Sequence, residues 1–177
     1  MKFRLLLVCV LTLGSMLRAQ ARTELTSRDI ERVQREVRHE LVMLAYLGVF
    51  DNVAYKVEAS GGVTLVGQVT RPLLKSEAET AIRRIEGVDR VDNRIEVLPL
   101  SPFDDTLRLR LFRAIYGYGP LEKYALGANK PIRIIVNNGR VELTGVVDNE
   151  ADRSIAGVRA NGVSNVFSVK NSLRVAK

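Results

Sequence analysis

The sequence is poor in the residues from which most catalytic and metal sites are built. Its 177 residues include one cysteine, one histidine and no tryptophan. The cysteine, Cys9, lies in an N-terminal segment that we expect to be removed, so the mature chain should have neither a thiol nor a disulfide. Cysteine nucleophiles and zinc sites built from cysteine and histidine are therefore excluded.

The remaining candidates for catalysis are weak. His39 lies between Arg38 and Glu40 on the side of a predicted helix that should face solvent, which does not favour a metal or triad role. The carboxylates are scattered, or fall at helix caps and in i,i+4 pairs, and no glycine-rich phosphate loop is present. We therefore expect no enzyme, no cofactor, no metal and no small-molecule substrate.

Long apolar runs are also scarce, with one exception at the N-terminus. Lys2 and Arg4 precede an apolar run over residues 5–17, and Ala19-Gln20-Ala21 fits the small-x-small rule for signal-peptide cleavage. The run is short for a membrane span, so an anchored protein is not favoured. We interpret residues 1–21 as a secretory signal peptide.

What the sequence does contain is an internal repeat. The segment 62–69 (GVTLVGQV) returns as 140–147 (RVELTGVV), with Gly67 and Gly145 78 positions apart. Within each copy Val, Leu, Gly and Val lie two apart, which is the alternation of a strand with one buried face. The same offset aligns a later stretch, listed as Val91, Asn93, Ile95 and Val97 with Val169, Asn171, Leu173 and Val175. We predict a duplicated domain.

Three glycines of the repeat are candidate structural residues. Gly67 and Gly145 lie on the buried side of their strands, where they either let a helix pack closely on the sheet or allow a bulge. A direct ligand contact is the alternative. Gly87 lies opposite Asn165, and these two residue types best tolerate a left-handed backbone after a helix.

Each copy is expected to contain a helix, two strands, a helix and a third strand. The first two strands form an antiparallel hairpin, and the third is parallel to the second because a helical crossover precedes it. The predicted fold is α/β, an α+β sandwich of two tandem αββαβ units, each a three-stranded mixed sheet covered by two helices. We place the units at 24–98 and 104–177, with a linker at 99–103.

Local signals predict how some of these elements begin and end. Ser27 and Asp29 can cap the first helix, and Asp148 can cap the helix over 149–161. The apolar run 41–50 is expected to bury the end of the first helix and the turn into its own sheet. Asn137-Asn138-Gly139 is a strong hairpin turn.

Basic charge is concentrated in the second unit. The formal net charge is +7. Residues 24–98 contain 11 basic and 13 acidic residues, a net charge of −2, whereas residues 104–177 contain 12 basic and 7 acidic residues, a net charge of +5. At about 1 kcal/mol for each Lys or Arg near an anionic bilayer, the attraction would be weak and sensitive to salt. Nucleic acid is not favoured, because no RNA-binding signature is present.

The residues most suited to contact a partner lie in this unit. The candidate binding residues are Arg108, Arg110, Arg113, Arg153, Arg159, Tyr118 and Tyr124. The two tyrosines belong to a loop over 117–127, which we expect to fold over its own core. The alternative is a partly exposed aromatic contact, since tyrosine suits a boundary between apolar and wet surroundings.

The duplicated pattern resembles the BON domain, named from bacterial osmotically induced and nodulation proteins. The resemblance depends on residues 62–69 and 87–97 in the first copy and on residues 139–147 and 166–175 in the second. It implies a tandem-repeat bacterial periplasmic protein associated with envelope stress and with binding of phospholipid or another envelope surface. In a lipid-binding relative the second domain meets anionic lipid through its helix.

By position, the resemblance points to the helix over 149–161, with Arg153 and Arg159, and equates the family's glycines with Gly67 and Gly145. Arg108, Arg110, Arg113 and the tyrosine loop are the alternative contact. A rival function is an envelope protein-interaction module that uses strand edges or this loop. An apolar patch beside Tyr118 and Leu121 would favour that rival, and a small-ligand carrier would need a pocket between the units.

Overall fold

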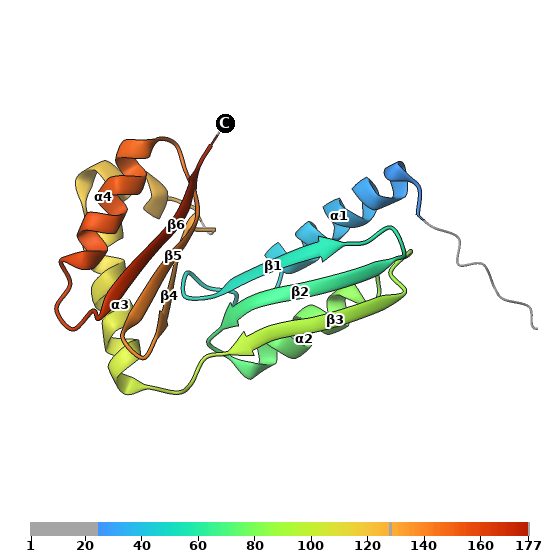
Figure 1. Ribbon diagram of the computed structural model, residues 1–177, viewed down its shortest axis with the longest axis horizontal. Helices are drawn as coiled ribbons and strands as arrows, with labels where there is room; N and C mark the ends of the chain where they lie inside the picture. Colours follow the sequence, from blue (N-terminus) through green and yellow to red (C-terminus); the bar gives the residue numbers. More distant parts are fainter. Residues whose placement is uncertain (1–24, 128, 177) are drawn as a thin grey trace, which may run out of the picture.

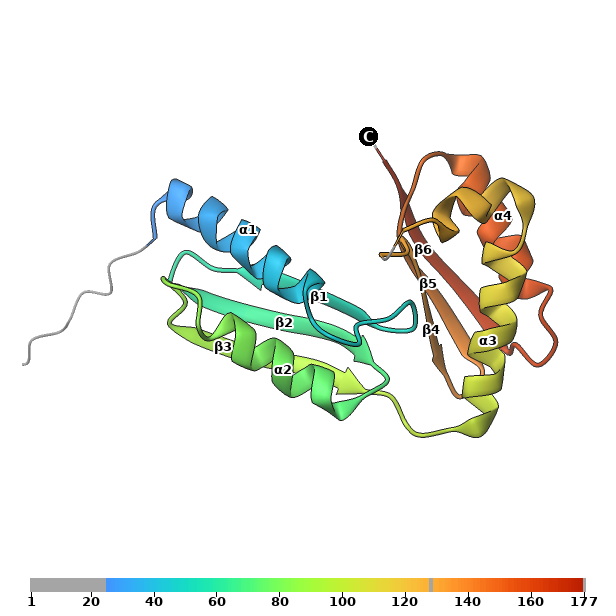
Figure 2. The same ribbon diagram turned by 180° about the vertical axis from the view of Figure 1, so that it is seen from behind.

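The computed structural model describes residues 25–127 and 129–176, which form two units of the same topology (Figure 1). The predicted signal peptide, residues 1–21, lies outside the described residues. In each unit two helices cover one face of a three-stranded sheet and leave the other face uncovered, as both ribbon views show (Figure 2). The prediction of two tandem αββαβ units with mixed sheets is confirmed.

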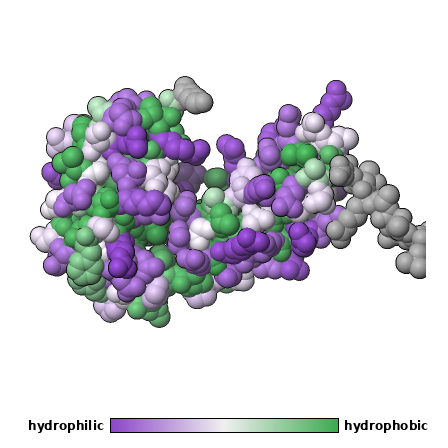
Figure 3. Space-filling view, viewed as in Figure 1, coloured by the Kyte–Doolittle hydropathy of each residue, from purple (hydrophilic) through white to green (hydrophobic). Residues whose placement is uncertain are grey.

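The first unit contains α1 (Ser27–Val42), β1 (Asn52–Val57), β2 (Gly62–Val69), α2 (Pro72–Ile82) and β3 (Arg90–Val97). Its strand order is β1-β2-β3, with β1 antiparallel and β3 parallel to β2. Val33, Val37 and Leu41 of α1 are buried at helical spacing against the alternating apolar residues of β2, so periodicity alone accounts for the core. The uncovered sheet face is largely hydrophilic (Figure 3).

The second unit contains α3 (Pro102–Tyr116), η1 (Gly119–Ala125), β4 (Ile132–Asn137), β5 (Arg140–Val147), α4 (Glu150–Asn161) and β6 (Ser168–Val175). Its strand order, β4-β5-β6, repeats that of the first unit. Helix α3 begins inside the segment that we expected to be a linker. The tyrosine loop forms the 3-10 helix η1, and Leu121 and Tyr124 are buried, so this loop folds over its own core as expected.

The caps of two helices differ from the predicted ones by one residue. Thr26, rather than Ser27, caps α1, and its hydroxyl accepts from Asp29 N–H while the Asp29 carboxylate accepts from Thr26 N–H. Asn149, rather than Asp148, caps α4 by accepting from Asp152 N–H. Several capping residues stand in a row at each site, so composition alone did not identify the one that the backbone uses.

Gly67 and Gly145 are needed for a close approach of two strands. Their φ angles are +129° and +121°, a region that side chains rarely adopt. A Cβ on Gly67 would lie 2.0 Å from the carbonyl oxygen of Asn52, and one on Gly145 would lie 1.8 Å from that of Pro131. Glycine is therefore required by the backbone of the neighbouring strand. The expectation of close helix packing or of a bulge was wrong, since the strand register continues without interruption through both glycines.

The expected left-handed positions are present. Gly87 and Asn165 have φ angles of 88° and 73°, and Asn138 and Gly139 form the hairpin turn with φ angles of 50° and 73°. The Asp104 carboxylate accepts from the N–H groups of Asn138 and Gly139, at 2.8 and 2.9 Å. The first residues of α3 thus hold the hairpin of the second sheet.

The apolar run at 41–50 does not stay within its own unit. Val49 and Phe50 pack against the core of the second unit, where the Phe50 ring meets Phe112 edge-on at a centroid distance of 6.4 Å. Ile134 N–H of β4 donates to the Val49 carbonyl at 2.8 Å. The expectation that this run buries the helix end and the turn is confirmed for Leu41, Leu44 and Leu47, whereas its last two residues pack against the other unit. The loop after α1 reaches β4 in both ribbon views.

Candidate functional site

Three of the predicted arginines lie on the outer side of the two helices of the second unit. Arg110 and Arg113 of α3 and Arg159 of α4 are exposed, and none forms a salt bridge with another described residue. The Arg159 Nε donates to the Ala114 carbonyl at 3.0 Å, so the Arg159 side chain of α4 lies directly against α3. We call Arg110, Arg113 and Arg159 the basic helix face.

Exposed apolar side chains accompany the basic helix face. Leu109 is 51% and Val158 70% exposed, and each is a sequence neighbour of one of its arginines. Phe103, seven residues before Arg110, shares its side of α3 and stacks on the exposed Phe167 at 6.4 Å. Sequence reasoning missed these residues, because the candidate binding residues were chosen only among the arginines and tyrosines of this unit.

Arg108 is not available to a partner in this structure. It is only 4% exposed, its guanidinium forms a salt bridge with Asp105, and its Nη2 donates to the Val136 carbonyl at 2.7 Å. Its proposed contact with lipid is corrected on this ground. Two residues at about 100° each place Arg108 and Arg110 about 160° apart around α3, and Arg108 is the one on the side that faces β4.

Arg153 is separated from the other candidate of α4. Six residues at about 100° each place Arg153 and Arg159 about 120° apart around the helix. The Arg153 side chain pairs with Glu150 at 3.0 Å, and its carbonyl accepts from Asn171 of β6. Arg153 and Arg159 were predicted to bind lipid together because they lie in the same helix, but in the structure they contact different neighbours.

The two candidate tyrosines also differ. Tyr124 is 7% exposed, and its hydroxyl donates to Asp152 at 2.6 Å while accepting from Asp148 N–H at 2.7 Å. It is a structural residue, and its proposed contact with lipid is corrected. Tyr118 is partly exposed and its ring lies 4.8 Å from the Arg159 guanidinium carbon, so it belongs beside the basic helix face.

Lys123 of η1 forms salt bridges with two aspartates at the start of α4. Its ammonium lies 2.7 Å from the carboxylates of both Asp148 and Asp152. Hydrogen bonds from Lys123 hold the pKa of both carboxyls below the ordinary aspartate value, with Tyr124 adding to the effect. Lys123, Tyr124, Asp148 and Asp152 are named here the η1 clasp.

The outer strand of the second sheet has few free backbone groups. The Tyr116 hydroxyl donates to the Ile132 carbonyl and accepts from Ile132 N–H, at 2.6 and 3.1 Å. Burial raises the pKa of the Tyr116 hydroxyl above the ordinary tyrosine value. The Val49 carbonyl, the Arg108 guanidinium and the Asp104 carboxylate satisfy further groups along the strand and its turn. The edge of β4 is thus largely closed to an added strand.

The features that would favour rival functions are limited. Leu121 is fully buried, so no apolar patch extends from Tyr118 to Leu121. A pocket of about 120 Å³ lies where the units meet, and it is lined by Arg133 together with residues of the first unit. Pockets for drug-sized ligands are about 300 Å³ or more, so this pocket suits only a small group.

Neither a cluster of metal-ligating side chains nor a membrane-spanning helix is present among the described residues. Across residues 25–127 and 129–176, no group of three or more histidine, cysteine, aspartate or glutamate side chains is arranged to hold a metal ion. Among the helices that the structure describes, none is long and apolar enough to cross a membrane.

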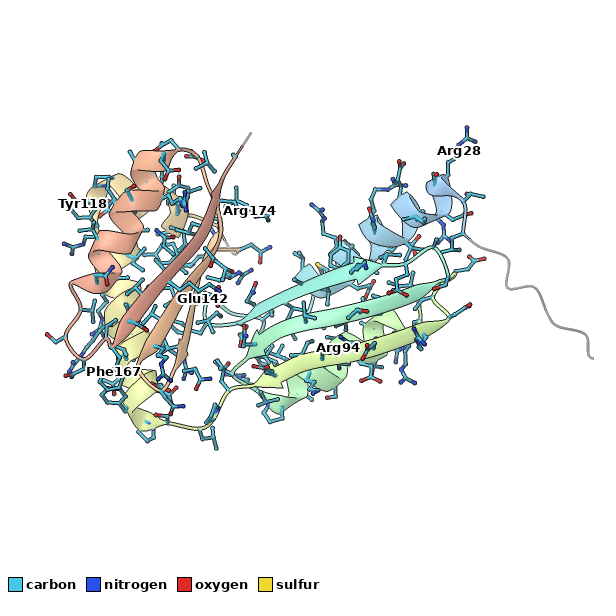
Figure 4. All side chains as sticks on the ribbon, viewed as in Figure 1. Arg28, Arg94, Tyr118, Glu142, Phe167 and Arg174 are labelled. Atoms are coloured by element: carbon cyan, nitrogen blue, oxygen red, sulfur yellow. The ribbon has the colours of Figure 1, made fainter. Side chains whose placement is uncertain are left out.

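The sides of the second unit differ in character: Glu142 and Arg174 lie on the uncovered sheet face and Tyr118 on the helix side (Figure 4).

Comparison with known proteins identifies one family. A family model described as the BON domain matches residues 29–99 and 121–177. The second match begins within η1, so it leaves out α3 although that helix repeats the position of α1. No curated protein matches the chain.

Two solved structures share a limited resemblance with the chain. One is CdsD, a structural protein of the type III secretion system of Chlamydia trachomatis, with 15% identity and a TM-score of 0.32 over 82% of this chain and 94% of that chain. The other is the C-terminal domain of CdsD, with 15% identity and a TM-score of 0.31 over 81% of this chain and 96% of that chain. These similarities are too low to support a functional inference.

Proposed function

The chain belongs to the BON domain family, and on that premise we propose that its second unit docks weakly on anionic phospholipid at the bacterial envelope. In this proposal the protein is a non-enzymatic periplasmic component that supports envelope integrity under stress. The observation that supports it is the basic helix face, where three exposed arginines from two helices converge without carboxylate partners among the described residues.

The electrostatics fit a surface better than a point ligand. The three arginines are exposed and are spread over the two helices of the α3–α4 pair. At about 1 kcal/mol for each cation near an anionic bilayer, the three together contribute roughly 3 kcal/mol. Leu109, Val158 and the Phe103–Phe167 stack would add apolar contact at the headgroup boundary.

Co-sedimentation of the whole chain with vesicles tests this proposal. We expect binding to phosphatidylcholine vesicles containing phosphatidylglycerol, little binding to phosphatidylcholine alone, and release as salt shortens the screening length. The triple variant Arg110→Glu, Arg113→Glu, Arg159→Glu should bind at least about tenfold more weakly.

A matched triple variant in the first unit, Arg28→Glu, Arg84→Glu, Arg90→Glu, makes the same change in net charge at exposed arginines. It should keep most of the binding. Equal loss in the two triple variants would mean that only net charge matters, and binding to neutral vesicles as strong as to anionic ones would sink the proposal.

A further inference from the structure

The outer strands of the two sheets differ in whether the backbone N–H and C=O groups along their outer edge have hydrogen-bond partners. Strand β1 has in the first unit the place that β4 has in the second, and Val53 corresponds to Ile132 because each pairs with the repeat glycine of the next strand. In β4, Ile132 and Ile134 find partners in Tyr116 and in the Val49 carbonyl. The corresponding groups of β1 therefore need partners too.

The register shows which groups these are. Glu58 N–H donates to the Gly62 carbonyl at the hairpin, so Glu58 and every second residue before it face β2. Val53, Tyr55 and Val57 consequently direct their N–H and C=O groups away from β2. On that side, no hydrogen-bond partner for them is present within residues 25–127 and 129–176. We call these outward groups the β1 edge.

The helix that flanks each strand explains the difference. The buried residues Val33, Val37 and Leu41 of α1 have the same spacing as Leu107, Leu111 and Ile115 of α3. The residues that follow them are Gln34, Arg38 and Val42 in α1, and Arg108, Phe112 and Tyr116 in α3.

In α3 these three side chains cover the outer edge of β4. Arg108 and Tyr116 hydrogen-bond to β4, and Phe112 receives the Phe50 ring from the other unit. Their counterparts do not. The Val42 side chain has no polar group. Among the described residues the one hydrogen bond between Gln34 and β1 is made by the Gln34 backbone carbonyl, which accepts from the Tyr55 hydroxyl at 2.9 Å. An unpaired strand edge of this kind is a template for an added strand.

Arg38 gives this edge a positive charge. It lines two adjoining hollows, the pocket of about 120 Å³ shared with Arg133 and a second one of about 300 Å³ formed with Glu31, Gln34 and Arg35. Neither Arg38 nor Arg133 forms a salt bridge with another described residue. Burial lowers the pKa of Arg133, whose guanidinium donates to the Gly48 carbonyl at 2.7 Å.

The one carboxylate in the shared pocket is already engaged. Asp51 is 2% exposed, and its two oxygens accept from Thr70 N–H, from the Thr70 hydroxyl and from Gly48 N–H. The pocket therefore keeps an excess of positive charge, with Arg38 exposed at its mouth. A carboxylate from outside would provide the missing countercharge.

We infer that the β1 edge is a docking site for an extended acidic segment of a partner protein. A carbonyl of that segment accepts from Tyr55 N–H, as the Val49 carbonyl accepts from Ile134 N–H in the other unit. A glutamate or aspartate then takes, against Arg38, the place that Phe50 has against Phe112. Backbone bonds supply affinity and the acidic side chain supplies selectivity.

A second copy of this chain is the less suited occupant. Pairing two β1 edges across a twofold axis would bring equivalent cations of the two chains into one interface, including Lys56 of the strand itself and Arg38. Like charges placed together in this way oppose association. Two β1 edges therefore do not match each other in charge, whereas an acidic strand matches either of them.

Peptide binding to the whole chain tests the inference. The probes are two labelled peptides of alternating valine and a charged residue, one with glutamate and one with lysine, followed by fluorescence anisotropy. The acidic peptide should bind and the basic one should not. In the complex the amide hydrogens of Val53, Tyr55 and Val57 should exchange more slowly with solvent, because they become hydrogen-bonded.

Two variants locate the site. Arg38→Glu should weaken binding of the acidic peptide by about tenfold or more and improve binding of the basic one. The double variant Gln34→Arg, Val42→Tyr copies the side chains of α3 and should close the edge, with binding lost and folding kept since Val42 is 47% exposed. Arg90→Glu, at an exposed position of β3 on the opposite edge of the same sheet, is the matched control and should bind as the unmodified chain does.

The outcomes separate this inference from lipid docking, which involves the other unit. Equal binding of the two peptides, or no change in exchange at the β1 edge, would overturn it. So would protection of these amides in the free chain that rises with protein concentration, because this would assign the edge to a second copy.

Discussion

The two units have the same topology and the same repeat glycines, yet their outer strands are in opposite states. In the second unit Tyr116 and Arg108 of the flanking helix, together with Val49 of the first unit, cover the edge of β4. In the first unit the helix offers Gln34 and Val42 at the same places, and the β1 edge stays unpaired. One backbone plan can therefore give a closed or an open edge through a few side chains.

Charge follows the same division. The second unit has a positive net charge and carries three exposed arginines on its helices, while the outer edge of β4 is already hydrogen-bonded. The first unit is slightly acidic overall but has Arg38 beside an open edge. A duplicated domain has thus separated two kinds of surface, one on a helix pair and one on a strand. The predictions below test what the units share and where they differ.

The largest expected effect concerns what the units share. Gly67→Ala and Gly145→Ala should each destabilise their unit by about 3 kcal/mol or more, because the new Cβ collides with a strand carbonyl at a positive φ. Denaturant unfolding measures this cost. Gly119→Ala, where nothing lies within 4 Å, is the control and should change little. Clearly unequal costs at the two repeat glycines would break the comparison.

The next effect concerns the junction. Phe50→Ala should cost about 2 kcal/mol, less than a fully buried phenylalanine, and should affect the second unit more than the first. Faster hydrogen exchange at Ile134, whose N–H donates to Val49, is the local readout. Met43→Ala, at an exposed position of the same connection, should leave this amide unchanged. A loss confined to the first unit would contradict the docking described here.

The smallest effect concerns the η1 clasp, which has no equivalent in the first unit, where Thr70 and Leu74 stand in place of Asp148 and Asp152. The folded-state pKa values of both aspartates are lowered, so their stabilisation is complete above the unfolded value of about 3.9 and is lost as the pH falls through the lowered values. Lys123→Ala should make the pH dependence of unfolding shallower in that range. An unchanged slope would rule out the clasp as its source.

The fold was predictable because its signals are local and occur twice. Alternation in β2 and β5, helical spacing in α1, and the Asn138-Gly139 turn each specify one element, and connection rules give the mixed sheet. The family match adds support and covers most of the chain. Capping residues were predicted only to within one position.

The site was less predictable because its residues depend on contacts between distant segments. Phe50 belongs to an apolar run that would fit its own core equally well, and only the structure shows it against Phe112. Arg108 and Arg110 are alike in sequence, but one is buried against β4 and the other is exposed. Arg159 reaches α3 through a bond to Ala114, which no spacing rule indicates.

The docking of Val49 and Phe50 on the second unit also bears on how such units could be joined in longer arrays. The connection after α1 extends away from its own core, so the first unit contributes Val49 and Phe50 to the core of the second unit. The corresponding connection after α3 is folded down as η1, with Leu121 and Tyr124 buried in its own core. The second unit therefore has no segment in this connection that could extend to another unit as Val49 and Phe50 do.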